Sequence, residues 1–193
     1  MQEDRKIKIR AAELGDAEEL LKIYAPYVEN TAITFEYEVP SLQEFQQRIE
    51  KIREKYPYFA AEQDGELVGY TYAGPLKERA AFDWAVETTI YIRQDKKGMG
   101  IGKKLYDRLE SSLKEQGILN LYACIAYPEQ EDKYLTKDSI RFHKHLGYKW
   151  IGKFQNCGYK FQRWYHMVWM EKEIGQHLKE QPRLKVFKNM KQN

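Results

Sequence analysis

The stretch that decides the fold of this 193-residue chain is Glu87-Thr-Thr-Ile-Tyr-Ile-Arg-Gln-Asp-Lys-Lys-Gly-Met-Gly-Ile-Gly-Lys-Lys-Leu105. It begins as an apolar, β-branched strand, breaks at Gln94–Lys97, passes three alternating glycines and continues as a helix. A strand that enters a turn and then a helix directs several backbone N–H groups and the helix dipole at one place. Glycine has no Cβ, so the backbone can approach a bulky anion. The stretch therefore predicts a site for a phosphate or pyrophosphate.

The residues around the glycines separate three kinds of nucleotide-binding loop. A Walker A loop ends in Gly-Lys-Ser/Thr, whereas this chain has Gly102-Lys103-Lys104 and offers no hydroxyl for magnesium. The Rossmann fingerprint spaces its glycines as G-x-G-x-x-G and usually opens a chain, which does not fit here. The run instead resembles the R/Q-x-x-G-x-G/A loop of the GNAT acyltransferases, with Lys97 in place of Gln or Arg. The resemblance implies that the pyrophosphate of acetyl-CoA is held by Lys97, Gly98, Met99, Gly100, Ile101, Gly102 and Lys103.

The composition is that of one globular domain, with 42% hydrophobic and 32% charged residues. No apolar run approaches the roughly 20 residues of a membrane span, and Met1 to Arg10 contain no apolar signal core. Cys124 and Cys157 form no CxxC pair and indicate no disulfide framework. We therefore expect a cytoplasmic protein with no membrane partner and no metal site.

The positive charge is concentrated at the C-terminus. Residues 175–193 hold five cations, Lys179, Arg183, Lys185, Lys188 and Lys191, against Glu180. Subtracting that surplus of four from the formal net charge of +3 leaves about −1 on the rest of the chain. A nucleic-acid binder carries its positive charge on a folded face, so we expect no nucleic-acid partner. The predicted organisation is a domain over residues 1–174 and a solvated basic tail over 175–193.

The sequence before the glycine stretch predicts two helices and several strands. Asp16 and Glu19 form a capping box before the first helix, which Pro26 kinks or ends. Ser41 and Glu44 cap the second helix, and Asp64-Gly65 is a strong hairpin turn. Gly74-Pro75 ends the second strand of that hairpin. The predicted strands are Ile7–Arg10, Tyr58–Glu62 and Leu67–Ala73, with a further strand after a loop in Asn30–Val39.

The sequence after the glycines alternates helices and strands. A helix from Ile101 is closed by Gly117, and a shorter one, Ser139–Leu146, is ended by Gly147. Between them lies a polar excursion, Tyr127–Lys137. The predicted strands are Leu119–Ala126, Tyr148–Phe154 and Tyr165–Glu171. An early hairpin followed by this alternation predicts an α/β fold in which a central mixed sheet carries helices on both faces.

From about Ile9 to Glu171 this order resembles the GNAT fold, and more narrowly the phosphinothricin and methionine sulfoximine N-acetyltransferase group. Six stretches carry the resemblance: Thr34-Phe35-Glu36; Gly74-Pro75-Leu76-Lys77-Glu78-Arg79; Val86-Glu87-Thr88-Thr89-Ile90-Tyr91-Ile92; Ser139-Ile140-Arg141-Phe142-His143; Leu146-Gly147-Tyr148; and Gly158-Tyr159-Lys160-Phe161-Gln162-Arg163-Trp164. The chain departs from the group at His166, where an acidic or amide residue is common, and in a longer loop at Glu129–Lys137. The resemblance implies a homodimeric enzyme that moves an acetyl group directly from acetyl-CoA to the primary amine of a small polar acceptor.

Glu87 is the leading candidate for the general base. It interrupts an apolar strand, where burial raises the pKa of a carboxyl group toward the operating pH. The alternative is a structural ion pair with Lys77 or Arg79, and the resemblance favours the base. His143 matches the last residue of the group's motif, which implies a supporting acid–base or orienting role. A packed, hydrogen-bonded side chain is the alternative for His143.

The resemblance also implies roles for other side chains. The amides of Thr89, Ile90, Tyr91 and Ile92 would pair with the pantetheine arm as an added strand does. Thr136 and Ser139 would contact coenzyme A, and Lys103 and Lys104 would add charge unless they are simply solvated. Lys77, Arg79 and Arg163 are the candidates for holding an acidic acceptor, and Phe35 is a candidate for the wall of its pocket.

Some assignments stay open from the sequence. Tyr37, Trp84 and Trp164 are either walls of the acceptor pocket or core, and Tyr127 or Tyr134 would protonate the departing thiolate. Cys124 fits a small buried hydrophobe. Two other functions compete with the amino-acid acetyltransferase: an acyl-CoA-sensing module without catalysis, and an acetyltransferase of protein N-termini or lysines.

Overall fold

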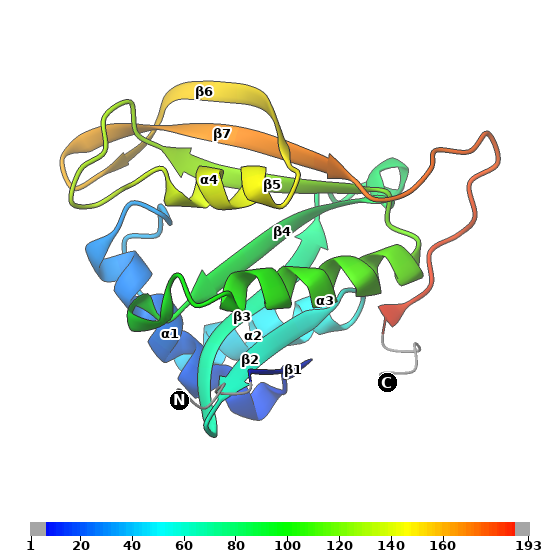
Figure 1. The fold of residues 1–193 in the computed structure, drawn as a ribbon, viewed down its shortest axis with the longest axis horizontal. Coiled ribbons are helices and arrows are strands. Elements are labelled where there is room, and N and C mark those ends of the chain that lie inside the picture. The colour runs from blue at the N-terminus through cyan, green and yellow to red at the C-terminus, as the bar shows by residue number, and fades with distance from the viewer. Residues whose placement is uncertain (1–6, 188–193) are drawn as a thin grey trace, which may run out of the picture.

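The computed structural model describes residues 7–187 and contains one seven-stranded mixed sheet in the order β1-β2-β3-β4-β5-β7-β6 (Figure 1). The pairs are antiparallel except β4 with β5, which run parallel. The strands are β1 Lys8–Ala11, β2 Tyr58–Gln63, β3 Glu66–Pro75, β4 Ala85–Ile92, β5 Asn120–Tyr127, β6 Lys149–Lys160 and β7 Arg163–Glu173.

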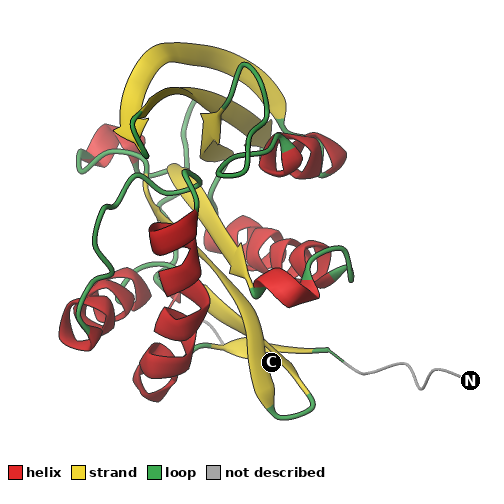
Figure 2. Cartoon of the chain, turned by 90° about the vertical axis from the view of Figure 1, so that its left-hand side faces the viewer, coloured by secondary structure: helices red, strands yellow, loops and turns green. Residues whose placement is uncertain are grey.

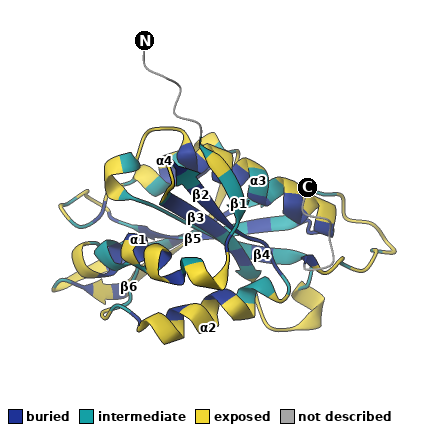
Figure 3. Cartoon of the chain, turned by 90° about the horizontal axis from the view of Figure 1, so that it is seen from below, coloured by how far each residue is buried: buried dark blue, intermediate teal, exposed yellow. Residues whose placement is uncertain are grey.

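Helices cover both faces of the sheet, as predicted (Figure 2). The α-helices are α1 Ala17–Asn30, α2 Leu42–Arg53, α3 Ile101–Gln116 and α4 Asp138–His145, and short 3-10 turns are η1 Leu14–Asp16, η2 Ala80–Phe82 and η3 Gln94–Lys96. α1 and α2 bury Leu20, Ile23 and Phe45 on one face, while α3 buries Leu105 and Leu109 on the other. Figure 3 shows the buried strands between helices whose outer surfaces are exposed.

The first helix differs from the prediction at both ends. Asp16 does not cap Glu19; its carboxylate accepts the N–H of Glu13 at 2.7 Å and pairs with Arg10 at 2.7 Å. Pro26 does not end α1, which continues to Asn30. Burial of Tyr27 and Val28 against the core explains the continuation, because packing outweighs one lost helical hydrogen bond.

The strands also differ in length from the prediction. The segment between α1 and α2 contains no strand, although it is rich in Thr, Phe and Tyr. β3 continues through Gly74 and Pro75, which lie opposite Glu87 and Val86. β6 extends to Lys160 across a bulge between Phe154 and Gly158. The expected turns are confirmed at Asp64-Gly65, where both φ angles are positive, and at Gly117, which closes α3.

Part of the basic tail packs on the domain. Phe187 is buried against Phe59, with ring centres 5.9 Å apart, and Leu184 also contacts the core. The Lys185 N–H donates to the Gln116 carbonyl at 2.9 Å. The expectation of a solvated end is therefore wrong for these apolar side chains, while Lys188 and Lys191 lie outside the described residues. Within residues 7–187 no helix has the length and apolar character needed to span a bilayer.

Candidate active site

The central feature of the site is the separation of β4 from β5. The two strands pair only from Ala85 to Glu87, opposite Asn120 to Tyr122. Beyond that point β4 continues beside β3, and β5 continues beside β7. The sheet is therefore open in its middle just after Glu87.

The alternation of an antiparallel ladder shows which β4 groups face the opening. Leu76 N–H donates to Ala85 O, and Arg93 N–H donates to Val68 O, so the odd-numbered residues of β4 bond to β3. The even-numbered residues Ile90 and Ile92 consequently turn their N–H groups toward the side that β5 has left. Four residues, Thr89 to Ile92, were predicted to pair with the pantetheine arm, but the backbone groups of Thr89 and Tyr91 bond to β3 instead. A chain with its own amides could pair with Ile90 and Ile92.

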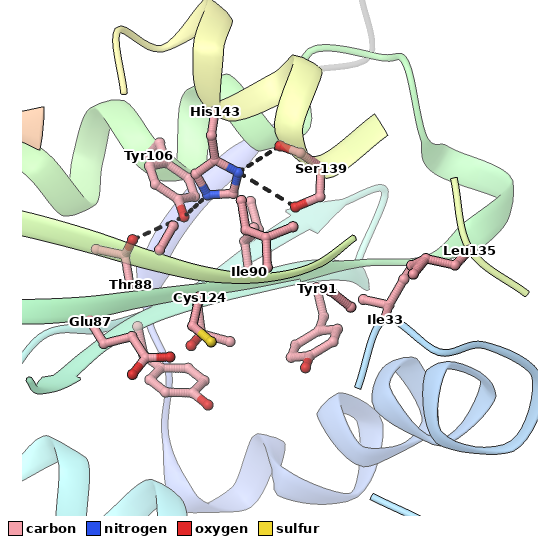
Figure 4. Close-up of a pocket in the computed structure, with 15 residues that line it drawn as sticks. Ile33, Glu87, Thr88, Ile90, Tyr91, Tyr106, Cys124, Leu135, Ser139 and His143 are labelled. Carbon is pink, nitrogen blue, oxygen red and sulfur yellow. Dashed lines mark hydrogen bonds between the residues drawn. The ribbon is translucent and has the colours of Figure 1, made fainter. Parts of the chain in front are cut away.

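A cavity of about 260 Å³ occupies this opening and reaches both faces of the sheet (Figure 4). On one side of the strands lie Glu87, Tyr91 and Cys124, and on the other lie Thr88, Tyr106 and His143. The remaining lining residues are Ile33, Tyr72, Thr89, Ile90, Ala123, Ile125, Ala126, Leu135 and Ser139. A molecule bound on one face can therefore meet a molecule bound on the other through the gap.

Glu87 lies in this cavity with its carboxylate desolvated. Burial raises the pKa of Glu87 above its ordinary value of 4.5, and the positive charge of Lys77 opposes the shift. Glu87 forms no ion pair with any residue between 7 and 187, so the structural salt bridge to Lys77 or Arg79 is not present. The raised pKa makes this carboxylate a better proton acceptor than an exposed glutamate. The thiol of Cys124 beside it stays neutral, because burial raises its pKa to about 12.

His143 is buried and bonded through both ring nitrogens. Nδ1 lies 2.7 Å from the Ser139 carbonyl oxygen, which can only accept, so Nδ1 carries the proton. Nε2 is then an acceptor for the Tyr106 hydroxyl at 2.9 Å. Burial lowers the pKa of His143 to about 4. The ring is therefore a neutral group that orients Tyr106, whose hydroxyl also lies 3.2 Å from Thr88 Oγ1.

The glycine turn has two conformational requirements and one packing requirement. Gly98 and Gly100 both have a φ of +77°, in the left-handed region that disfavours residues with a side chain. Gly100 precedes the first residue of α3, so the N–H groups of the first helical turn have no helical partner. A Cβ on Gly102 would lie 3.0 Å from the Phe142 ring. Gly102 thus allows α4 to pack closely on α3.

The lysines around the turn have different surroundings. Lys97 places its ammonium 5.0 Å from the centre of the Tyr27 ring. Lys103 pairs with Asp107 at 2.6 Å along the exposed surface of α3, and Lys104 is exposed beside it. Met99 is also exposed, whereas Ile101 is buried in the core. The turn therefore presents mainly backbone donors, with Lys97 as its adjacent cation.

The other predicted site residues lie at varying distances from the cavity. Lys77 and Arg79 are exposed in the segment that joins β3 to η2. Arg163 pairs with Asp132 at 2.8 Å, and Phe35 packs against Gly158. Ser139 lines the cavity, while Thr136 is exposed and donates to Asp138 at 2.7 Å. Neither Tyr127 nor Tyr134 lines it.

Tyr106 and Tyr72 line the cavity but were not singled out from the sequence. Tyr106 follows Leu105 in the buried stripe of α3 and is fully buried, so its spacing matches that of a core residue. Tyr72 is one of 15 tyrosines and belongs to a row of stacked rings with Tyr58 and Tyr70. No local signal in the sequence separates either residue from the tyrosines of the core.

Comparison with known proteins agrees with this geometry. A family model described as an acetyltransferase (GNAT) domain matches residues 9–169. Phosphinothricin N-acetyltransferase of Streptomyces viridochromogenes is 32% identical over 89% of this chain and 90% of its own length. An L-methionine sulfoximine/L-methionine sulfone acetyltransferase of Pseudomonas paraeruginosa is 29% identical, covering 84% of this chain and 92% of its own.

A solved structure extends the likeness to the fold. The crystal structure of a GNAT superfamily phosphinothricin acetyltransferase from Sinorhizobium meliloti, in complex with AcCoA, superposes with a TM-score of 0.84. It is 29% identical in sequence, and the match covers 93% of this chain and 95% of that one.

Proposed function

This chain belongs to the GNAT acetyltransferase family, and from that membership we propose that it transfers the acetyl group of acetyl-CoA to the primary amine of a small polar acceptor. The observation that carries the proposal is the desolvated carboxylate of Glu87 at the opening between β4 and β5. The names of the relatives support an amino-acid-like acceptor such as phosphinothricin or methionine sulfoximine.

Acetyl-CoA fits the α3 side of the opening. Its pantetheine arm carries amides that would pair with the backbone N–H groups of Ile90 and Ile92, which face the opening; the Ile92 carbonyl already accepts the Tyr27 hydroxyl. Its pyrophosphate would meet the N–H groups at the start of α3 and the ammonium of Lys97. The relative from Sinorhizobium meliloti in complex with AcCoA supports this choice of donor. Ser139, on the same side of the cavity, would contact the cofactor.

The chemistry follows from the two-sided cavity. An acceptor on the Glu87 side loses a proton from its ammonium group to the carboxylate, directly or through a water molecule. The neutral amine then attacks the thioester carbonyl carbon, and the tetrahedral intermediate collapses with cleavage of the C–S bond. The products are an N-acetylated acceptor and coenzyme A, whose thiolate takes up the proton that the attacking nitrogen releases. His143 acts in this scheme by orienting Tyr106, not by touching the acceptor.

Cations near the Glu87 side would hold an acidic acceptor. The charge of Lys77 acts on the pKa of Glu87, which supports Lys77 as a cation near the reacting amine. Arg79 and Arg163 are the further candidates, with Phe35 as an apolar neighbour. Arg163 already pairs with Asp132 and would contact an acceptor only through the remaining face of its guanidinium.

The proposed assembly is a homodimer. Within residues 7–187, β6 is an edge strand that pairs only with β7, and an edge with apolar side chains favours association with another chain. The exposed apolar side chains of β6 and the start of β7 are Trp150, Ile151, Phe154, Tyr159 and Trp164. Light scattering on the purified chain tests the assembly independently of activity.

The decisive experiment is a thiol-release assay with acetyl-CoA across a library of amino acids, sulfoximines and phosphinates. Turnover that depends on Glu87 supports the proposal. Tight binding of acetyl-CoA without transfer to any amine would instead indicate a sensing module. Labelling of proteins in a lysate incubated with isotopic acetyl-CoA, detected by mass spectrometry, would indicate a protein acetyltransferase.

A further inference from the structure

Lys160 is a buried lysine at the end of β6, with 2% of its surface exposed. Its Nζ donates to the carbonyl oxygens of Val28 at 2.7 Å and Thr34 at 2.9 Å. It forms no ion pair with any residue between 7 and 187. A buried ammonium is costly unless dipoles replace its hydration, and here two carbonyl groups do so.

The first of these carbonyls belongs to the end of α1. Val28 lies in the last turn of that helix, where carbonyl groups lack helical partners and the dipole is negative. Thr31 follows the helix and its hydroxyl donates to the Tyr27 carbonyl at 2.7 Å. Lys160 and Thr31 thus satisfy neighbouring carbonyls at a helix end that has no glycine cap. The site for the ammonium is built from fixed backbone groups.

The second carbonyl belongs to the loop of residues 31–36. This loop contains no strand or helix of its own, and its Ile33 lines the cavity that contains Glu87. Figure 4 shows Ile33 on the same side of the strands as Tyr91 and Glu87. The position of the 31–36 loop therefore shapes the side of the cavity where the acceptor would bind.

Neighbouring contacts join the same loop to the same strand. The Phe35 ring lies on Gly158, where a Cβ would come within 2.4 Å of it. Just past the loop, the Tyr37 hydroxyl donates to the Tyr159 carbonyl. The end of β6 is therefore one support of the 31–36 loop, beside Tyr24, whose hydroxyl lies 2.9 Å from Thr34 Oγ1, and Arg48, which pairs with Glu36 at 2.7 Å. Lys160 supplies the charged, fully buried part of that support.

We propose that Lys160 is a positioning residue for the acceptor. Its ammonium fixes the 31–36 loop, which forms the acceptor wall, the lining of the cavity on the Glu87 side, so that this wall is preorganised for binding. The inference rests on the proposed function for its consequence in catalysis. Lys160 touches neither substrate. It acts through the loop, and the α3 side of the cavity, where the cofactor would bind, is independent of it.

The test uses Lys160→Met, which keeps the length and removes the charge and donors, with Lys149→Met as the control. Lys149 is an exposed residue at the start of the same strand. For the best acceptor of the library, Lys160→Met should raise KM about tenfold, because the wall is no longer preorganised. Its kcat and the Kd for acetyl-CoA should stay within about twofold of wild type. A matched loss of acetyl-CoA affinity, or an unchanged acceptor KM, would overturn the proposal.

A second variant perturbs the loop without touching Lys160. Gly158→Ala drives a Cβ into the Phe35 ring and should raise the acceptor KM in the same way. Gly152→Ala, which has open space and an ordinary φ, is its control. If Gly158→Ala leaves the acceptor KM unchanged, the position of the 31–36 loop does not determine how the acceptor binds.

Hydrogen exchange keeps the inference separate from the proposed function. Lys160→Gln retains donors without the charge and should speed amide exchange in residues 30–37 while α3 and β4 stay protected. This result is expected even if no amine in the library is acetylated, in which case only the proposed function fails. Unchanged exchange in residues 30–37 would show that Lys160 does not hold the loop.

Discussion

The hydroxyl of Tyr106 lies 2.9 Å from Nε2 of His143, and the opposite ring nitrogen is held by the Ser139 carbonyl. Nδ1 donates to a carbonyl and Nε2 accepts from the hydroxyl, so a proton added at Nε2 would require the Tyr106 hydroxyl to turn toward Thr88 and accept instead. His143, which the sequence motif suggests as an acid or base, is therefore held as a neutral ring. We therefore expect the ionisation of His143 to affect the stability of the fold and not the pH dependence of the reaction.

Acid should destabilise the protein through His143. Its pKa is 6.5 when unfolded and about 4 when folded, so the unfolded chain binds more protons between these values. Stability is lost as the pH falls from 6.5 to 4, by as much as about 3 kcal/mol. Urea unfolding of His143→Gln should lack this dependence. His145→Gln, an exposed neighbour, should retain it, and a parallel loss of slope in both variants would contradict the assignment.

Replacing the proposed base should remove the reaction and leave the cofactor bound. Glu87→Gln should lower kcat by about 10²- to 10⁴-fold, the usual contribution of a general base. Calorimetry should give an unchanged Kd for acetyl-CoA. Glu115→Gln, on the exposed surface of α3, serves as the control. If kcat of Glu87→Gln falls by less than about tenfold, another residue is the general base.

Lys77 should control the pH at which the reaction switches on. A base acts when deprotonated, so activity falls as the pH drops through the raised pKa of Glu87. The charge of Lys77 lowers that pKa, and Lys77→Met should therefore move the acid limb of kcat/KM to higher pH. If the acid limb of the profile stays in place or moves to lower pH, the charge of Lys77 does not lower the pKa of Glu87. The profile is measured with saturating acetyl-CoA.

Adding one methyl group at Gly102 should disturb the contact between α3 and α4. The new Cβ would lie 3.0 Å from the Phe142 ring and 3.2 Å from Ile92 Cδ1. Gly102→Ala should lower the free energy of unfolding by about 1–3 kcal/mol, the range for overpacking. Phe142→Leu should restore part of it in a double-mutant cycle. If the effects of the two substitutions on the free energy of unfolding are additive, the strain does not come from contact with the Phe142 ring.

Removing the aromatic ring near the end of the described chain should destabilise the domain. Phe187→Ala deletes a buried side chain that packs on Phe59, at an expected loss of about 3 kcal/mol in the free energy of unfolding. Leu178→Ala removes an exposed side chain of the same tail and should change stability by less than about 0.5 kcal/mol. Equal effects would mean that the tail does not dock in solution.

Much of the fold was predictable because its signals are local. The apolar strand before the glycines, the turn at Asp64-Gly65 and the cap formed by Ser41 and Glu44 each follow from a few neighbouring residues. The failures come from distant contacts. Asp16 binds Arg10 instead of capping Glu19, and α1 passes Pro26 because the residues beyond it are buried. The turn at Phe161-Gln162 has two positive φ angles without glycine, so β6 and β7 were predicted too short.

The candidate site divides in the same way. Glu87 stands out because a carboxylate interrupts an apolar strand, and the glycine turn has a recognisable spacing. Tyr106 and Lys160 do not stand out, because a tyrosine next to a core leucine and a lysine at a strand end are ordinary in sequence. What makes them distinctive is the partner: a histidine 37 residues away for Tyr106, and a carbonyl 132 residues away for Lys160.

The parting of β4 from β5 has a consequence for how this enzyme can diversify. In the proposed arrangement the donor side is formed largely by main-chain groups, and point mutations cannot delete a peptide N–H except by introducing proline. The proposed acceptor side is formed by side chains on a loop and a hairpin, which point mutations can replace. Selection can therefore retune which amine is modified while the acyl carrier stays the same.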